Sequence, residues 1–230
     1  MIALVLLSHY LASQAGQARI QNRSVVELGA GTGLPGVVAA HFADKVAVTD
    51  GNEVVLDLLN QNVAALQSKD DSNVCPASAL PLVWGDHDQL QALLKHMSVV
   101  DVVVAADVVQ WPSVLEPLLQ TVKALLWNSE AEQKPVFIVG IVNRASSTYD
   151  LFFELAREFG FTCHKVEASE YLPGGVMPKS CQEFGGRSTE IYEVVLEDRS
   201  EFPALLRTEQ DTTRDWTVGT SYYENAAFPC

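Results

Sequence analysis

The chain has 230 residues, of which 48% are hydrophobic and 19% are charged, and its formal net charge is -14. This length and composition are enough for one large hydrophobic core, so they predict a single domain. The negative charge argues against a nucleic-acid surface, which needs clustered lysine and arginine; it fits a soluble acidic protein or one with a cationic partner.

The N-terminal apolar run predicts a helix over residues 2–14 rather than a secretory signal. Leu4, Leu7 and Leu11 recur at helical spacing. The run has no basic start, and His9 and Tyr10 interrupt it early. No stretch of the chain is apolar enough over a sufficient length to span a bilayer, so we expect no membrane segment.

Beyond this helix, strand and helix patterns alternate. The expected strands cover residues 24–28, 45–49, 81–84, 99–107, 136–142, 161–166 and 190–196. The expected helices cover residues 34–43, 53–66, 88–96, 112–126 and 149–159. This alternation predicts an α/β fold, with a doubly wound, mostly parallel seven-stranded sheet and helices on both faces. The last two strands have no clear helix between them and are expected to add an antiparallel strand at the edge.

The connection at residues 171–187 is rich in glycine and proline, and it fits either a substrate loop or a surface loop. We place the domain at residues 1–198. The tail at 199–230 is polar with scattered aromatic residues, and its composition leaves its order open. The four cysteines are widely spaced without a C-x-x-C pair, which is typical of reduced thiols inside the cell. Neither they nor the scattered histidines have the spacing of a metal site.

The most informative motif is Val-Val-Glu-Leu-Gly-Ala-Gly-Thr-Gly-Leu-Pro-Gly at residues 25–36. An apolar strand leads into glycines at alternate positions, where backbone can approach a ligand because no Cβ stands in the way. The next strand ends in Asp50, where a carboxylate can accept hydrogen bonds from ribose hydroxyls. This combination predicts a nucleoside-containing cofactor.

One alternative is a NAD enzyme, because residues 31–36 formally satisfy G-x-G-x-x-G. Glu27 opposes it, since a carboxylate just before the glycines would repel a pyrophosphate. A cofactor with an amino-acid cation would instead be attracted by Glu27. The strand also meets Gly29 first, so the tight turn is expected at residues 29–31.

Residues 27–36 resemble the first motif of the seven-β-strand S-adenosylmethionine-dependent methyltransferases, and more narrowly the methyltransferase-like protein-lysine methyltransferase group. The resemblance covers roughly residues 3–197. It continues through Thr49-Asp50, Asn60-Gln61-Asn62-Val63, Val83-Trp84-Gly85-Asp86 and Ala105-Ala106-Asp107-Val108-Val109. This ordered set is much more specific than the glycine motif alone.

The resemblance implies that S-adenosylmethionine is held by Glu27, Gly29, Ala30, Gly31, Asp50, Trp84 and Ala106. The glycine turn would wrap the methionine end, and Asp50 would bind the ribose. Trp84 would pack on the adenine, and Ala106 would line the methionine pocket. The alternatives are a core position for Trp84 and a strand-end or helix-cap role for Asp50; Asp86 is either a helix cap or a ligand contact.

Asp107 follows a buried strand, at the edge where open α/β sheets bind ligands. In the family it would begin an Asp-x-x-Tyr-like motif and act as the catalytic residue; the alternative is a helix cap before Pro112. The fourth position here is Gln110, so the aromatic wall beside the substrate amine is missing unless Trp111 replaces it. Family members also carry a Trp-containing segment before the first helix. This chain begins inside that helix, so we expect the N-terminal part of the family domain to be missing.

Taken together, these features predict a methyltransferase that uses S-adenosylmethionine and methylates lysine side chains of a protein substrate. We expect a cytoplasmic monomer, also possible in the nucleus, without nucleic acid, membrane or metal as partners. One alternative is a methyltransferase acting on another protein side chain or on a small molecule. Another is a non-catalytic binding module that retains the fold.

Overall fold

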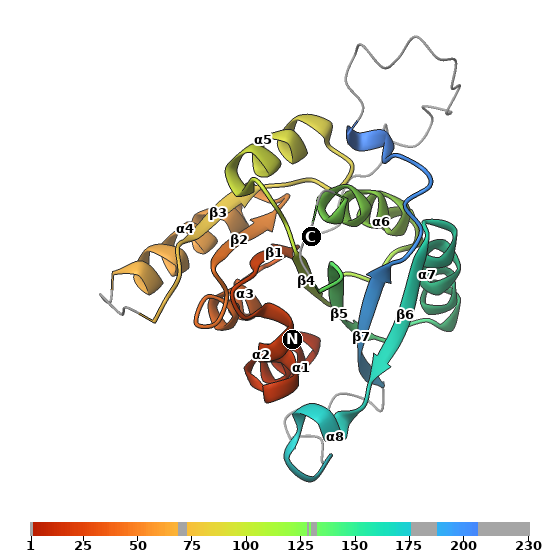
Figure 1. Cartoon of the computed structure of the whole chain (residues 1–230), viewed down its shortest axis with the longest axis horizontal. Coiled ribbons are helices and arrows are strands. Elements are labelled where there is room, and N and C mark those ends of the chain that lie inside the picture. The colour runs from red at the N-terminus through yellow and green to blue at the C-terminus, as the bar shows by residue number, and fades with distance from the viewer. Residues whose placement is uncertain (1, 69–72, 128, 130–132, 176–187, 207–230) are drawn as a thin grey trace.

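The computed structural model describes residues 2–68, 73–127, 129, 133–175 and 188–206, which form a seven-stranded sheet between layers of helices (Figure 1). The strands are β1 (Ser24–Leu28), β2 (Lys45–Asp50), β3 (Ala77–Pro81), β4 (Val102–Ala106), β5 (Val136–Val142), β6 (Phe161–Val166) and β7 (Thr189–Leu196). The helices are α1 (Ile2–Ala12), α2 (Gln14–Ile20), α3 (Leu34–Ala39), α4 (Glu53–Gln67), α5 (His87–Met97), α6 (Pro112–Leu126), α7 (Ser146–Glu158) and α8 (Ala168–Tyr171). Short 3-10 turns follow at η1 (Pro173–Gly175) and η2 (Ala204–Leu206).

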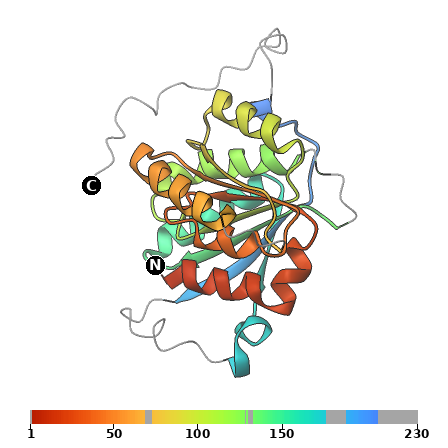
Figure 2. The same ribbon diagram turned by 90° about the vertical axis from the view of Figure 1, so that its left-hand side faces the viewer.

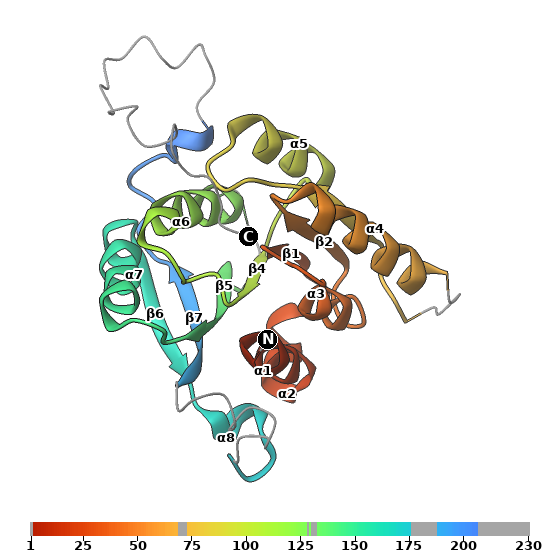
Figure 3. The ribbon, with the colours of Figure 1, turned by 180° about the vertical axis from the view of Figure 1, so that it is seen from behind.

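The sheet has the strand order β3-β2-β1-β4-β5-β7-β6. The strands from β3 to β5 are all parallel, whereas β7 runs antiparallel to both β5 and β6. The expected α/β fold is confirmed, including the antiparallel pair at the edge. Within that pair β7 is the reversed strand and lies one position in, and β6 forms the edge itself. Seen from behind, β6 and α7 lie at one end of the sheet and α4 at the other (Figure 3).

Helices cover both faces of the sheet, as a doubly wound fold requires. The core on one face includes Val103, Phe137 and Val194 and is covered by α5, α6 and α7. The core on the other face includes Val104 and Ile138 and is covered by α1, α2, α3 and α4. Figure 2 shows α5 and α6 above the strands and α1 below them. The central strands are buried on both faces, which explains their nearly continuous apolar sequence.

The helix expected over residues 2–14 is observed as α1, which ends two residues earlier, at Ala12; a second helix that was not predicted, α2, begins at Gln14 after Ser13. The Ser13 hydroxyl accepts a hydrogen bond from the N–H of Gly16 at 3.2 Å and donates to the carbonyl of Tyr10 at 2.7 Å. Gly16 allows this tight turn, because a Cβ there would lie 2.0 Å from the Tyr10 oxygen. A serine N-cap and close packing therefore end the first helix where apolar periodicity alone predicted continuation.

The third strand was predicted at residues 81–84, which is wrong: β3 is Ala77–Pro81. Its residues are small and not β-branched, so propensity did not mark them. Pairing with β2 decides the position, from Val46 opposite Ala77 to Asp50 opposite Pro81. Pro81 has no N–H to continue the ladder, and it stands at the strand's end.

The first part of the tail packs on the domain. Phe202 meets Trp127 edge to face, with ring centroids 5.7 Å apart. The Nδ1 atom of His87 lies 3.0 Å from the carbonyl oxygen of Leu205, which joins η2 to α5. The rest of the tail, and residues 176–187 of the glycine-rich connection, lie outside the described residues. The domain boundary at residue 198 stays a prediction.

Candidate functional site

The predicted site residues gather at the carboxyl edge of the parallel strands. β1 lies between β2 and β4 in the sheet, so the chain leaves β1 toward one side and returns to β4 on the other. In open α/β sheets this reversal opens a crevice beside the strand ends, which is where ligands bind. The turn after β1, the end of β2 and the end of β4 therefore meet at one place (Figure 1).

The glycine turn after β1 depends on left-handed backbone. The φ angles of Gly29, Gly31 and Gly33 are 59°, 56° and 76°, in a region that residues with a Cβ rarely adopt. A Cβ on Gly31 would meet no atom within 4 Å, so the space beside this residue is open to a ligand. Ala30 shapes the turn: its side chain is buried, and its N–H donates to the carbonyl of Thr49 at 2.9 Å.

Asp50 faces this turn from the end of β2. One carboxylate oxygen accepts a hydrogen bond from the N–H of Gly31 at 3.0 Å, and the other accepts from the N–H of Asn52 at 3.0 Å. The cap of α4 is Asn52, whose side chain accepts from the N–H of Val54 at 2.9 Å. The helix-cap alternative for Asp50 thus applies to Asn52 instead. Asp50 is only partly buried, so its carboxylate stands beside the open face of Gly31.

Glu27, unlike Asp50, is bonded to α3 rather than to the glycine turn. Its side chain is 1% exposed, and Oε2 accepts a hydrogen bond from the N–H of Gly36 at 2.8 Å in the first turn of α3. Burial, together with the smaller effect of the Asp50 charge, raises the pKa of this carboxyl to about 8, even though the hydrogen bond from the Gly36 N–H lowers it in part. The structure therefore places Glu27 where it joins α3 to β1. Its contact with a cofactor cation stays a prediction.

Trp84 packs on the glycine turn from the loop after β3. Its Cζ2 atom lies 3.0 Å from the position that a Cβ of Gly29 would take. The next residue holds the loop, because the N–H of Gly85 donates to Oγ1 of Thr121 in α6 at 2.9 Å. Trp84 remains partly exposed and is packed against one of the two cores. The tryptophan thus packs on the core and also borders the glycine turn.

Asp86 is the N-cap of α5. Its carboxylate accepts a hydrogen bond from the N–H of Gln89 at 2.9 Å. Of the two alternatives for this residue, the structure supports the helix cap. The Gln89 side chain accepts in turn from the N–H of Val83 at 2.7 Å, so α5 holds both ends of the loop that carries Trp84.

The end of β4 lies beside β1, on the side away from β2. Ala106 is half-buried and pairs with Gly140 of β5. The next residue, Asp107, has left-handed backbone with a φ of 60°, and its N–H donates to the Gly140 carbonyl at 2.8 Å. The start of α1 lies close by, since the carbonyl oxygen of Ala3 is 3.1 Å from the position of a Cβ on Gly140.

The carboxylate of Asp107 forms an ion pair with Arg144, which sequence reasoning missed. Arg144 Nε donates to Oδ1 at 3.3 Å, and Nη2 donates to Oδ2. The cap of α6 is Trp111, without a side-chain cap bond, so Asp107 does not cap this helix. Arg144 follows the end of β5, next to β4 in the sheet. Its position just after a strand, at the carboxyl edge of the sheet, is the feature of the sequence from which Arg144 could have been predicted as a site residue.

The Asp-x-x-Tyr-like position also differs from the family pattern in space. The side-chain amide of Gln110 turns back and donates to the carbonyl of Asp107 at 2.6 Å. The side chain of Trp111 is 59% exposed, so it does not pack into the core beside Asp107. Val108 and Val109 are buried and give the segment an apolar base.

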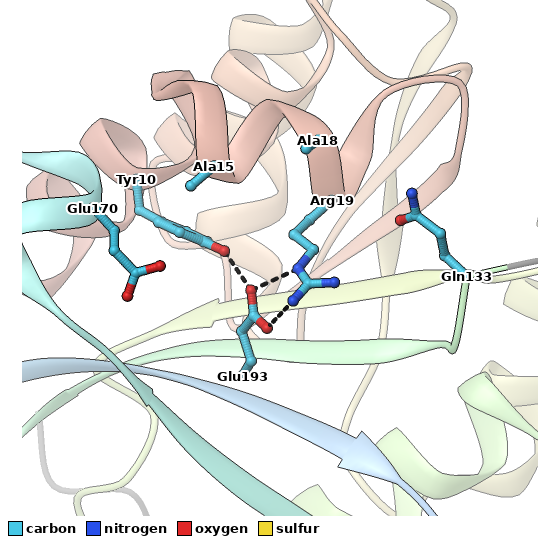
Figure 4. Close-up of a pocket in the computed structure, with 7 residues that line it drawn as sticks. All are labelled: Tyr10, Ala15, Ala18, Arg19, Gln133, Glu170 and Glu193. Atoms are coloured by element: carbon cyan, nitrogen blue, oxygen red, sulfur yellow. Dashed lines mark hydrogen bonds and ion pairs between the residues drawn. The ribbon is translucent and has the colours of Figure 1, made fainter.

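A second polar region lies away from the glycine turn, on the face of β7 beneath α1 and α2 (Figure 4). It surrounds a cavity of about 250 Å³ lined by Tyr10, Ala15, Ala18, Arg19, Gln133, Glu170 and Glu193. Glu193 accepts hydrogen bonds from the hydroxyl of Tyr10 at 2.5 Å and from Arg19 at 2.8 and 2.6 Å. We call these three residues the Glu193 clamp, since they join α1 and α2 to the sheet.

Two absences hold for the described part of the chain. Its helices are all too short or too polar to cross a membrane. No three of its histidine, cysteine, aspartate and glutamate residues are grouped so that they could hold a metal ion.

Comparisons with known proteins agree with this geometry. The family model described as lysine methyltransferase matches residues 2–159. Protein N-lysine methyltransferase METTL21A of Xenopus tropicalis is 35% identical over 119 residues, or 52% of this chain and 50% of that protein. METTL21A of Mus musculus is 36% identical over 134 residues, or 55% of this chain and 54% of its own length. The chain thus spans about half the length of these curated relatives.

The fold also resembles solved structures. A TehB-like SAM-dependent methyltransferase from Corynebacterium glutamicum superimposes with a TM-score of 0.54 at 12% sequence identity. The match covers 83% of this chain and 88% of that one. At this identity the likeness concerns the fold alone, and it is the doubly wound fold expected from the alternation of strands and helices.

Proposed function

The chain belongs to the lysine methyltransferase family, and we propose that it transfers a methyl group from S-adenosylmethionine to lysine side chains of a protein substrate. The observation that carries this proposal is the hydrogen bond between Asp50 and the N–H of Gly31. It brings the acid at the end of β2 against the left-handed glycine turn, with open space beside Gly31. A ribose at Asp50 and an amino-acid end at the turn fit this arrangement.

The chain's own residues can supply binding and orientation. Asp50 would accept hydrogen bonds from the ribose hydroxyls, Trp84 would pack on the adenine, and Ala106 would leave room because its side chain is small. When bound, S-adenosylmethionine supplies a methyl group that is already activated by its sulfonium charge. The Asp107 carboxylate would accept an N–H of the substrate amine, which would orient the nitrogen lone pair of the amine toward that methyl group. The amine must first lose its proton to solvent, and the apolar base of Val108 and Val109 would favour this loss because it disfavours the charged form.

One observation favours a second candidate function, which is methyl transfer to another protein side chain or to a small molecule. Gln110 stands where the family pattern has tyrosine, and its amide is bonded to the Asp107 carbonyl. With Trp111 largely exposed, no described aromatic ring at the fourth position covers an amine at Asp107. An acceptor other than a lysine amine would not need an aromatic side chain at this position.

The test is transfer of a tritiated methyl group from S-adenosylmethionine to the proteins and to the small metabolites of a cell lysate, assayed separately. Labelled methyl-lysine in hydrolysed protein supports the proposal. Label in another amino acid or in the metabolite fraction supports the second candidate. Calorimetry with S-adenosylmethionine and S-adenosylhomocysteine separates both methyltransferase functions from a non-catalytic module. No heat of binding at millimolar ligand would support the non-catalytic module.

We also propose that the protein acts as a cytoplasmic monomer without nucleic acid. The net charge of -14 supports the absence of a nucleic-acid partner, because it would repel phosphates. The thiols of Cys75 and Cys163 are free, and burial raises the pKa of each to about 11, which keeps them protonated. Such thiols suit a reducing compartment. Light scattering of the purified chain tests the monomeric state, which the mass of a dimer would contradict. Microscopy of a tagged chain tests the cytoplasmic location, which secretion would contradict.

A further inference from the structure

The carboxyl edge holds one strained residue, Asp107, that the glycine motif does not explain. Its φ of 60° is unusual for a residue with a side chain, although aspartate and asparagine tolerate this region better than others. Such strain persists where the surrounding contacts over-determine the conformation, and it concentrates at functional sites. The contacts of Asp107 therefore show which groups maintain it.

Three of these contacts hold different parts of the residue. Behind Asp107, its N–H donates to the Gly140 carbonyl of β5 at 2.8 Å. Ahead of it, the Gln110 amide donates to its carbonyl at 2.6 Å. Beside it, Arg144 bonds both carboxylate oxygens. The first two contacts hold the backbone of Asp107, whereas Arg144 contacts its carboxylate.

Arg144 is itself anchored by its neighbours. It is the second residue after β5, and the preceding residue, Asn143, donates its N–H to the carbonyl of Ser188 at 3.0 Å, just before β7. The arginine thus extends from a segment tied to two strands of the sheet. Its guanidinium reaches back over the neighbouring strand end, where Asp107 stands.

The side chains of Arg144 and Asp107 are 36% and 15% exposed, so solvent screens part of their attraction and the pair stabilises the fold less than a fully buried pair would. A two-point arginine–carboxylate contact has another property: it fixes the plane of the carboxylate. Fixing that plane fixes the directions from which the oxygens can accept an N–H of an incoming amine.

We propose that Arg144 is a positioning residue for the methyl acceptor, acting through the carboxylate of Asp107. This proposal rests on the proposed function, since it assigns Asp107 to the acceptor. Lysine at position 144 keeps the charge but lacks the planar fork, so it holds the carboxylate less firmly. Methionine removes the charge and keeps a side chain of comparable length.

The first test measures position without requiring activity. Three-bond NMR couplings about the Cα–Cβ bond of Asp107 report its χ1 rotamer in the wild type, Arg144→Met and Lys134→Met. Lys134 forms an exposed ion pair with Glu197 at the opposite edge of the sheet, so its variant is a matched loss of charge. We expect one rotamer in the wild type and in Lys134→Met, and averaged couplings in Arg144→Met. Unchanged couplings in Arg144→Met would overturn the proposal.

The second test measures methylation of a lysate protein that the wild type labels. We expect Arg144→Met to lower kcat/KM for the protein about 10- to 100-fold, because small displacements of an orienting group have costs of this size. The Kd for S-adenosylmethionine should stay within about twofold, and Arg144→Lys should recover part of the rate. In an Asp107→Asn background the same Arg144→Met change should cost little. An equal loss in both backgrounds would contradict action through Asp107.

The two tests separate the two proposals. If the wild type labels no protein, the proposed function fails, while the couplings still decide whether Arg144 holds the carboxylate. If Arg144→Met does not fold, which circular dichroism shows, Arg144→Lys takes its place in both measurements. Arg144→Lys with wild-type couplings and rate would then overturn the proposal, and altered couplings with a reduced rate would support it.

Discussion

The Glu193 clamp and the Asp107–Arg144 pair each join a strand of the sheet to another element through arginine and a carboxylate, but their surroundings differ. Glu193 is 9% exposed and receives three donated hydrogen bonds, two from Arg19 and one from Tyr10. Its backbone lies in regular β7 (Figure 4). Asp107 stands beyond its strand with left-handed backbone, at the edge where the predicted cofactor residues gather.

The difference separates a contact that stabilises the fold from one that serves a site. The clamp has a buried acceptor, several donors and no unusual backbone, so its role is complete without a ligand. Burial and the neighbouring Glu193 also raise the pKa of the Tyr10 hydroxyl, which keeps it a donor. At the carboxyl edge the backbone of the acceptor is left-handed, whereas the exposure of the pair, 36% for Arg144 and 15% for Asp107, is close to the 46% and 11% of Arg19 and Glu193. Changes at the edge should therefore alter binding and turnover, and changes at the clamp should alter stability.

The largest effect is expected for Asp50→Ala, which should raise the Kd for S-adenosylmethionine about 100-fold or more. Hydrogen bonds to a charged group contribute about 1.5–3 kcal/mol each, and the ribose offers two hydroxyls. Calorimetry measures the affinity. Asp44→Ala is the matched control, because Asp44 is an exposed aspartate just before the opposite end of β2. Equal affinities for Asp50→Ala and wild type would remove Asp50 from the cofactor site.

Glu193→Ala should next lower the free energy of unfolding by about 2 kcal/mol, with unchanged cofactor affinity. Breaking a buried ion pair costs about 3–5 kcal/mol, and the 46% exposure of Arg19 reduces that value. Urea denaturation measures the change. Glu197→Ala, which breaks the exposed pair with Lys134, should cost less than about 1 kcal/mol. Similar losses in the two variants would mean that the clamp does not stabilise the fold as we describe.

Glu27 sharpens the comparison, because it is buried against a backbone N–H rather than an arginine. Its folded pKa of about 8 lies above the ordinary value of 4.5, so between these values the folded state keeps a proton that the unfolded state has lost. Stability should therefore fall as pH rises through this range, by about 1.4 kcal/mol per pH unit. Glu27→Gln should lack this fall. Urea titrations of both proteins at pH 6 and 7 measure it; parallel pH dependence would show that Glu27 is ionised in the fold.

The smallest effect is expected for the stability of the Asp107–Arg144 pair. A double-mutant cycle with Asp107→Asn and Arg144→Met should give a coupling below about 1 kcal/mol in the free energy of unfolding. Urea denaturation of the four proteins measures it. A coupling as large as the loss in Glu193→Ala would make the edge pair a structural clamp as well, and the contrast between the two regions would be lost.

Much of the fold could be predicted from the sequence, because the signals are local. β-branched runs indicated the central strands, and the glycines marked the turn that left-handed backbone requires. Asp50 was expected at the end of β2, and it does face the turn. The third strand was misplaced because Ala77–Pro81 has little strand propensity and is held by pairing with β2. The break at Ser13 depends on the close approach of Gly16 to α1, which periodicity does not encode.

The sequence by itself determined the alternation of strands and helices, the glycine turn and the family to which its motifs point. These depend on side-chain periodicity and on backbone preferences within a few residues. Only the tertiary structure decided that Arg144 reaches Asp107, 37 residues away, and that Tyr10 reaches Glu193, 183 residues away. Such pairs form because the sheet brings distant segments together, and no local pattern shows which charged side chain a carboxylate will meet.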